Sequence, residues 1–231
     1  MYVVTIDQRA SSGDADRVPG LIGEISALTK ETFERTVGDE LQGVVARAPE
    51  VVDIALHALR SGRWYVGIGV GTATLSPSAS PREGTGTAFF AARKAVELAK
   101  MASRVPLSVV SGGTKRQDPK PKRATTELVT CSDAEAVLRL LGRLVLERTP
   151  AQWAVVDKIR LERSRSNRHG SQKLVAKDLG ITEQSVSRAL VRSGWEDECA
   201  GRPAAAKLLE QAQADMSAVV AEDCSRALAP R

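Results

Sequence analysis

The segment Gln172–Val191 constrains the fold of this chain more than any other stretch. Two sets of apolar residues recur there at the spacing of a helix face: Leu174, Val175 and Leu179, and then Val186, Ala189 and Leu190. Between the two sets, Gly180 can adopt a positive φ that ends one helix, and Thr182 can cap the next. Ala176 is small enough to let the two helices approach closely. The spacing therefore predicts two short helices joined by a tight turn.

Six further positions of the second predicted helix are polar, namely Glu183, Gln184, Ser185, Ser187, Arg188 and Arg192. They are mostly short polar side chains and arginine, which are the types that read base edges in a DNA major groove. The segment thus predicts a helix-turn-helix that binds double-stranded DNA, with a simple αα-hairpin without a ligand as the alternative. The residues predicted to face the bases are Gln184, Ser185, Ser187 and Arg188, and those predicted at the phosphates are Arg168, Gln172, Lys173 and Arg192. Thr182 and Glu183, at the start of the second helix, complete the predicted DNA-binding set.

The excess positive charge is concentrated around this segment. The whole chain has a formal net charge of +5. Between Ala151 and Trp195 there are nine Lys and Arg residues against four Asp and Glu residues, which accounts for the entire excess. A basic surface on the predicted helices is what attraction to DNA phosphates requires.

The composition is that of an ordinary globular protein, with 42% hydrophobic and 26% charged residues. No apolar run is long enough to span a membrane, and the N-terminus lacks the pattern of a signal peptide. We therefore expect a cytoplasmic protein without a membrane partner. Cys131, Cys199 and Cys224 lie far apart in the chain, so neither a zinc site nor a disulfide framework is expected.

The first half of the chain alternates between strand and helix patterns. The predicted elements are, in order, a strand at 1–6, a helix at 21–33, strands at 35–37 and 41–47, a helix at 49–61, a strand at 64–74, a helix at 88–102 and a strand at 105–110. This order predicts an α+β fold of the ferredoxin-like type, an antiparallel sheet with helices on one face. Gly67, Gly69 and Gly71 alternate along one strand, which indicates either close packing of a helix or room for a ligand.

The second half is predicted to be helical after one more strand at Glu127–Cys131. Helices are expected at 132–148, at 151–163 as a support for the helix-turn-helix, and at 204–228 after Gly201-Arg202-Pro203. The last helix would either pack on its own chain or form a dimer. We expect three parts, namely a ferredoxin-like domain over residues 1–148, an all-α helix-turn-helix domain over 149–198 and a C-terminal helix over 199–231.

Four short motifs of the first domain follow one another in a familiar order. They are Asp7 at the end of the first strand, Gly38-Asp39 at the hairpin tip before Glu40-Leu41-Gln42-Gly43, Val66-Gly67-Ile68-Gly69-Val70-Gly71 in the next strand, and Gly86–Arg93 at the start of the following helix. Together with the predicted helix-turn-helix, these motifs resemble the SatD-like family of bacterial proteins. More distantly, their order resembles the class III nucleotidyl cyclase domain.

The cyclase resemblance implies roles for three residues. In cyclases, aspartates at the places of Asp7 and Asp39 hold metal ions, and an arginine at the place of Arg93 stabilises phosphate. Such carboxylates can bind Mg²⁺ together with a small nucleotide. Phe89 stands where cyclases have an asparagine, so the resemblance implies a degenerate cyclase-like domain. The alternative is that the two aspartates only end a strand and form a turn.

The sequence therefore predicts a DNA-binding transcriptional regulator and not an enzyme, with no required cofactor. Its first domain would serve dimerisation or the sensing of a ligand such as a small nucleotide. A homodimer would place two recognition helices on a near-palindromic DNA site. The competing hypotheses are a metal-dependent protein that binds or processes a nucleotide through Asp7 and Asp39, and a first domain that only binds other proteins.

Overall fold

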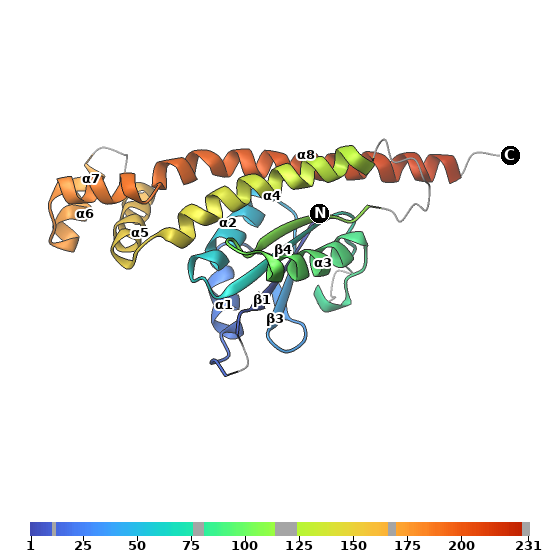
Figure 1. The fold of residues 1–231 in the computed structure, drawn as a ribbon, viewed down its shortest axis with the longest axis horizontal. Helices are drawn as coiled ribbons and strands as arrows, with labels where there is room; N and C mark the ends of the chain where they lie inside the picture. The colour runs from blue at the N-terminus through green and yellow to red at the C-terminus, as the bar shows by residue number, and fades with distance from the viewer. Residues whose placement is uncertain (11–12, 76–80, 114–123, 166–169, 228–231) are drawn as a thin grey trace.

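The computed structural model describes residues 1–10, 13–75, 81–113, 124–165 and 170–227, and it has the expected α+β class (Figure 1). The strands are β1 (Tyr2–Gln8), β2 (Phe33–Arg35), β3 (Glu40–Val45), β4 (Trp64–Val70) and β5 (Leu107–Ser111). The helices are α1 (Val18–Ile25), α2 (Ala48–Arg60), the 3₁₀ turn η1 (Pro81–Glu83), α3 (Thr87–Met101), α4 (Ala124–Glu147), α5 (Pro150–Arg165), α6 (Ser171–Leu179), α7 (Glu183–Arg192) and α8 (Trp195–Ala227).

One five-stranded sheet forms the centre of the fold, with the strand order β2-β3-β1-β4-β5. Strand β1 pairs antiparallel with β3 on one side and with β4 on the other, so that Thr5 stands opposite both Gln42 and Gly67. Strand β5 pairs parallel with β4, because helix α3 carries the chain back across the sheet between them. The sheet is therefore mixed, and the prediction of an antiparallel sheet was wrong at this edge.

Helices cover both faces of the sheet. Side chains alternate between the two faces along a strand. Val4 and Ile6 of β1 accordingly lie in the main core with residues of α1, α2, α4 and α8, whereas Val3 packs with Ala88 and Ala92 of α3. The prediction that the helices lie on one face was thus wrong, because α3 covers the opposite face.

The glycines of β4 explain how closely α3 approaches the sheet. A Cβ atom added to Gly67 would lie 2.3 Å from the backbone nitrogen of Val96, and one added to Gly69 would lie 2.1 Å from the carbonyl oxygen of Ala88. Any larger side chain would therefore push α3 off the sheet. Of the two interpretations of these glycines, close helix packing is confirmed.

Two local predictions in the first half need correction. Helix α1 spans Val18–Ile25 and not 21–33, with a proline in its first turn. Phe33 instead lies in β2, where its ring covers Gly43 of the neighbouring strand: a Cβ atom on Gly43 would lie 2.6 Å from the ring. A large apolar residue can satisfy either a helical or a strand pattern, and pairing with β3 decided between them.

Two long helices, α4 and α8, lie side by side along the main core (Figure 1). The predicted strand at Glu127–Cys131 was wrong, since these residues belong to α4. The predicted helix start near residue 204 was also wrong, since α8 begins at Trp195 and continues through Pro203. Glu198 before this proline and Ala205 and Ala206 after it are buried, and Gly201 lies against Leu141 of α4, so tertiary packing outweighs the lost helical hydrogen bond.

A second, smaller core lies at one end of the molecule. It contains eight buried residues of α5, α6, α7 and the start of α8: Val155, Val156, Ile159, Val175, Ala176, Val186, Leu190 and Trp195. Because α8 contributes to both cores, the structure has no break at residue 199, and the proposed three-part division stays a prediction. None of the helices in the described ranges combines the length and hydrophobicity needed to cross a membrane.

Candidate nucleic-acid interface

Helices α6 and α7 are joined by a tight turn at Gly180. This glycine has φ +64°, and its N–H donates to the carbonyl oxygen of Lys177 at 3.3 Å. The next N–H, of Ile181, donates to the carbonyl oxygen of Ala176 at 3.0 Å. These two bonds form the Schellman arrangement, which ends a helix and reverses the chain within two residues. The predicted role of the glycine is confirmed.

Thr182 begins α7 in the way that the sequence predicted. Its backbone is extended, and its Oγ1 accepts a hydrogen bond from the backbone N–H of Ser185 at 3.1 Å. The hydroxyl of Ser185 also lies 2.9 Å from the same oxygen. A cap of this kind satisfies one of the free N–H groups at the start of a helix. The Ser185 side chain therefore helps to hold the cap.

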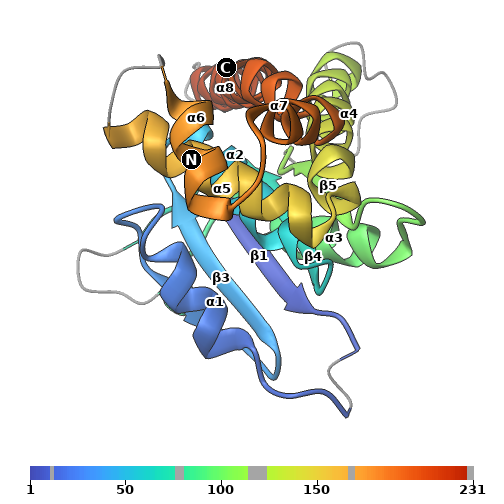
Figure 2. The same cartoon turned by 90° about the vertical axis from the view of Figure 1, so that its left-hand side faces the viewer.

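The two helices rest on α5, whose predicted supporting position is confirmed by the small core. Figure 2 views the molecule from the end at which α5, α6 and α7 lie. Val175 and Ala176 of α6 are buried there with Val186 of α7. Leu174 was predicted to share this core but is 48% exposed, because it lies on the polar face of α6 that points to solvent.

The outward face of α7 carries most of the residues that were predicted to contact bases. Gln184 and Arg188 lie four residues apart, so they share one helix face, and this face is opposite to the buried Val186 and Leu190. All of the predicted DNA-contacting residues that the structure describes are exposed: Gln172, Lys173, Thr182, Glu183, Gln184, Ser185, Ser187, Arg188 and Arg192. Arg168 lies outside the described residues.

Basic side chains are divided sharply between the supporting helix and the two outer helices. Lys158 and Arg163 of α5 are ion-paired, with Asp178 at 3.1 Å and with Glu196 at 2.7 Å. The four cations of α6 and α7 have no ion-pair partner in the described part of the chain: Lys173, Lys177, Arg188 and Arg192. Among the described side chains of α5, α6 and α7, the positive charge without an ion-pair partner thus lies on the outer helices α6 and α7.

One exposed residue on this face was not predicted. Val191 lies three residues after Arg188 and seven after Gln184, so it shares their helix face, and it is 78% exposed. An apolar side chain in such a position can contact the methyl group of thymine. The i, i+4, i+7 spacing from Gln184 was the signal that could have revealed it.

Of the two predicted metal ligands, Asp7 lies on β1 and Asp39 in the turn directly before β3. Asp7 of β1 pairs with Glu40 of β3, directly beside Asp39. The ammonium group of Lys100, on α3, lies 3.0 Å from Oδ2 of Asp7. Burial raises the pKa of Asp7, against the influence of Lys100, and the charges of Asp39 and Glu40 raise it further.

This arrangement fits an ion pair better than a metal site. Desolvation alone would lower the pKa of Lys100, but its hydrogen bonds with Glu97 and Asp7 raise it to about 12. The lysine therefore stays charged and competes with a metal ion for Asp7. Within the described ranges, no three His, Cys, Asp or Glu side chains are grouped so that they could hold a metal ion. Arg93 is exposed on α3, seven residues before Lys100 and therefore about 10 Å away along the helix.

The roles predicted for Asp7, Asp39 and Arg93 rest on the resemblance to cyclases alone. No protein-family model, no curated protein and no solved structure matches this chain.

Proposed function

We propose that this protein is a sequence-specific DNA-binding regulator, in which α6 and α7 act as a helix-turn-helix and α7 enters the major groove. The observation that carries this proposal is the outward face of α7. It combines Gln184, Arg188 and Val191 at one-face spacing with cations that have no partner in the described part of the chain. Arginine and glutamine recognise guanine and adenine through paired hydrogen bonds.

The roles of the individual residues follow from their positions. Gln184, Ser187 and Arg188 would face the bases. Lys173 and Arg192 would contact phosphates, because Lys173 is exposed in the first turn of α6 and Arg192 is exposed at the end of α7. We further propose that the protein binds DNA as a homodimer, since two α7 helices one DNA turn apart read a near-palindromic site.

The larger part of the chain would serve as the platform for these helices. We propose that β1 to β4 with α1 and α2 form a ferredoxin-like unit, on the basis of their β-α-β-β-α-β order and the strand order β2-β3-β1-β4. The competing hypothesis of nucleotide processing is not proposed, because Lys100 occupies the carboxylate of Asp7.

The test begins with selection of bound DNA from a random pool. On the selected site, Arg188→Ala should lower affinity about 5- to 150-fold, since one arginine–guanine contact contributes roughly 1–3 kcal/mol. Lys173→Ala should weaken binding to all sequences alike and reduce the slope of log affinity against log salt by about 1.

The matched control is Arg47→Ala. Arg47 is an exposed arginine at the start of α2, paired with Glu50 and outside the proposed interface. This variant should bind DNA as the parent protein does. If Arg188→Ala and Arg47→Ala bind the selected site equally well and with the same salt slope, α7 is not the recognition helix.

A further inference from the structure

An open cavity of about 350 Å³, which we call the junction cavity, lies where α2, α4, α5 and α8 meet. Its volume is within the range of cavities that bind small molecules in proteins. Six of its lining residues carry the chemistry of interest: His57, Arg60, Trp153, Arg160, Trp195 and Arg202. The rest of the lining includes Asp53 and apolar side chains, among them Leu56 of α2 and Val145 of α4.

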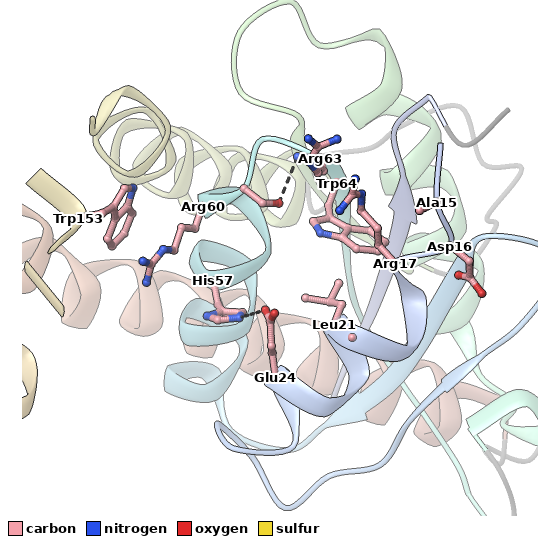
Figure 3. Close-up of a pocket in the computed structure, with 12 residues that line it drawn as sticks. Ala15, Asp16, Arg17, Leu21, Glu24, His57, Arg60, Arg63, Trp64 and Trp153 are labelled. Carbon is pink, nitrogen blue, oxygen red and sulfur yellow. Dashed lines mark hydrogen bonds and ion pairs between the residues drawn. The ribbon is translucent and has the colours of Figure 1, made fainter. Parts of the chain in front are cut away.

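A larger neighbouring cavity of about 750 Å³ shares His57, Arg60 and Trp153 with the junction cavity. Figure 3 draws it, with Arg60 extending toward Trp153 and His57 toward Glu24. The cationic groups of this larger cavity all have carboxylate partners. Arg17 and Arg63 share Asp14, Arg60 pairs with Asp157, and His57 pairs with Glu24. It therefore offers no unmatched charge to a ligand.

The junction cavity differs in its charge balance. A single buried carboxylate, that of Glu198, serves three guanidinium groups: Arg148 at 2.5 Å, Arg160 at 3.3 Å, and Arg202. Two further ion pairs belong to the junction, namely Arg60 with Asp157 and Arg202 with Asp53. In total, four arginines there share three carboxylates. Burial, and next the charge of Arg202, lower the pKa of Arg160. The junction is thus short of negative charge where water is partly excluded.

Two tryptophans give the cavity aromatic walls. Arg60 lies over the ring of Trp153 at 4.0 Å, and Arg160 lies over the ring of Trp195 at 4.9 Å. Stacking of this kind holds a guanidinium group in one orientation. Trp195 is only 5% exposed, and its Nε1 has no hydrogen-bond partner among the residues that the structure describes. A buried N–H without an acceptor is costly, and an acceptor on a ligand would satisfy it.

We propose that the junction cavity binds a small organic anion, with its carboxylate or phosphate group held by Arg160 and Arg202 and its apolar body against Leu56 and Val145. A guanidinium group has the planar fork that matches either head group. The ligand supplies the missing negative charge and an acceptor for Trp195. The expected ligand is therefore a small carboxylate or a small phosphate monoester, and not a metal ion or an organic cation.

The same cluster connects the cavity to α7. Arg148 binds Glu198 on one side, and on the other its Nε donates to the carbonyl oxygen of Ser193, the residue that ends α7, at 2.9 Å. Arg202 extends the connection to Asp53 of α2. An anion that draws Arg160 and Arg202 away from Glu198 leaves the carboxylate to Arg148 and changes how the end of α7 is held. This regulatory part rests on the proposed DNA binding, whereas the ligand site does not.

The test uses four probes that share one ring: benzoate, phenyl phosphate, benzyl alcohol and benzylamine. Calorimetric titration of the DNA-free protein at fixed ionic strength should detect benzoate, phenyl phosphate or both. Benzyl alcohol and benzylamine should bind at least tenfold more weakly, because they lack the negative charge. Comparing the two anions distinguishes a carboxylate ligand from a phosphate ligand.

Arg160→Gln should lower the affinity for the anion at least tenfold, and Arg160→Lys, which keeps the charge, should lower it less. Arg163→Gln is the matched control, because Arg163 lies one turn further along α5, pairs with Glu196 and does not line the junction cavity. The proposal is overturned if the parent protein binds neither anion at about 10 mM, a concentration that detects even interactions of roughly −3 kcal/mol. It is equally overturned if all four probes bind alike, or if folded Arg160→Gln binds like the control.

A separate gel-shift titration tests the regulatory part. At fixed ionic strength, the anion that binds should change the DNA affinity of the parent protein at least threefold and leave that of Arg160→Gln unchanged. If the anion binds in calorimetry but leaves the DNA affinity of the parent protein unchanged, the coupling is wrong and the site remains. If the protein binds no DNA at all, the proposed function fails, while calorimetry still decides the ligand site.

Discussion

Replacing Glu198 with glutamine should destabilise the protein far more than the same change at the surface. The side chains of Glu198 and Arg148 are both 0% exposed, and Arg160 and Arg202 depend on the same carboxylate. The amide of glutamine keeps one acceptor oxygen but turns a second group, a donor, toward an arginine. Removing one member of a buried ion pair costs about 3–5 kcal/mol, since the remaining charge stays buried.

The expected effect is large enough to measure directly by urea unfolding. With a denaturant dependence of about 2–3 kcal/mol per molar urea, a loss of this size moves the midpoint down by roughly 1–2.5 M. The measurement should follow both tryptophan fluorescence and helix content. Trp153 and Trp195 line the junction cavity, so fluorescence reports on this region.

Glu147→Gln provides the matched control. Glu147 pairs with Arg143 at 2.7 Å on α4, and the two side chains are 61% and 50% exposed. A pair so open to water contributes about 0–1 kcal/mol, so the midpoint should hardly move. If Glu198→Gln and Glu147→Gln unfold at the same urea concentration, the argument that Glu198 holds the junction together is wrong.

Two further predictions concern the main core. Gly69→Ala should lower the free energy of unfolding, measured by urea titration, by about 1–3 kcal/mol, because its Cβ would meet the backbone of α3. Gly20→Ala, with open space around it in α1, should be neutral or slightly stabilising. Equal stability of the two variants would refute the packing argument. Burial, followed by the charges of Glu210 and Cys131, raises the pKa of Tyr2 to about 12 from 10.0. Tyr2 therefore contributes stability that is complete below pH 10 and is lost as the pH rises through about 12. Melting temperatures measured across this range should fall more steeply for the parent protein than for Tyr2→Phe, and parallel curves would contradict the assignment.

The spacing of residues in the sequence was sufficient for the local features of α6 and α7. The turn at Gly180, the cap at Thr182 and the exposure of Gln184 and Arg188 all depend on residues within one or two helical turns. The α+β class and the order of β1 to β4 could also be predicted, because each strand and helix has its own period. The ends of helices and strands were predicted less accurately. Phe33, for example, was expected in a helix but lies in β2.

Only the tertiary structure decided the features that join distant parts of the chain. Which face of the sheet α3 covers depends on its contact with Gly67 and Gly69, and a parallel β5 depends on the path of α3. α8 continues through Pro203 because buried residues on either side of it along the helix, Glu198 before it and Ala205 after it, hold the helix in place against a strong local preference for a break.

The same division applies to the two sites. The proposed DNA-reading face could be recognised from the sequence, because a single helix displays its side chains at a fixed period. The junction of Glu198 with Arg148, Arg160 and Arg202 could not, because it brings together residues of α5, α8 and the end of α4, and no local period relates them. The sequence alone determined what the outer helices present to a partner. The packing of α8 against the rest of the chain decided the ion-pair cluster behind these helices. Burial removes Glu198 from water, so Arg148, Arg160 and Arg202 balance its charge.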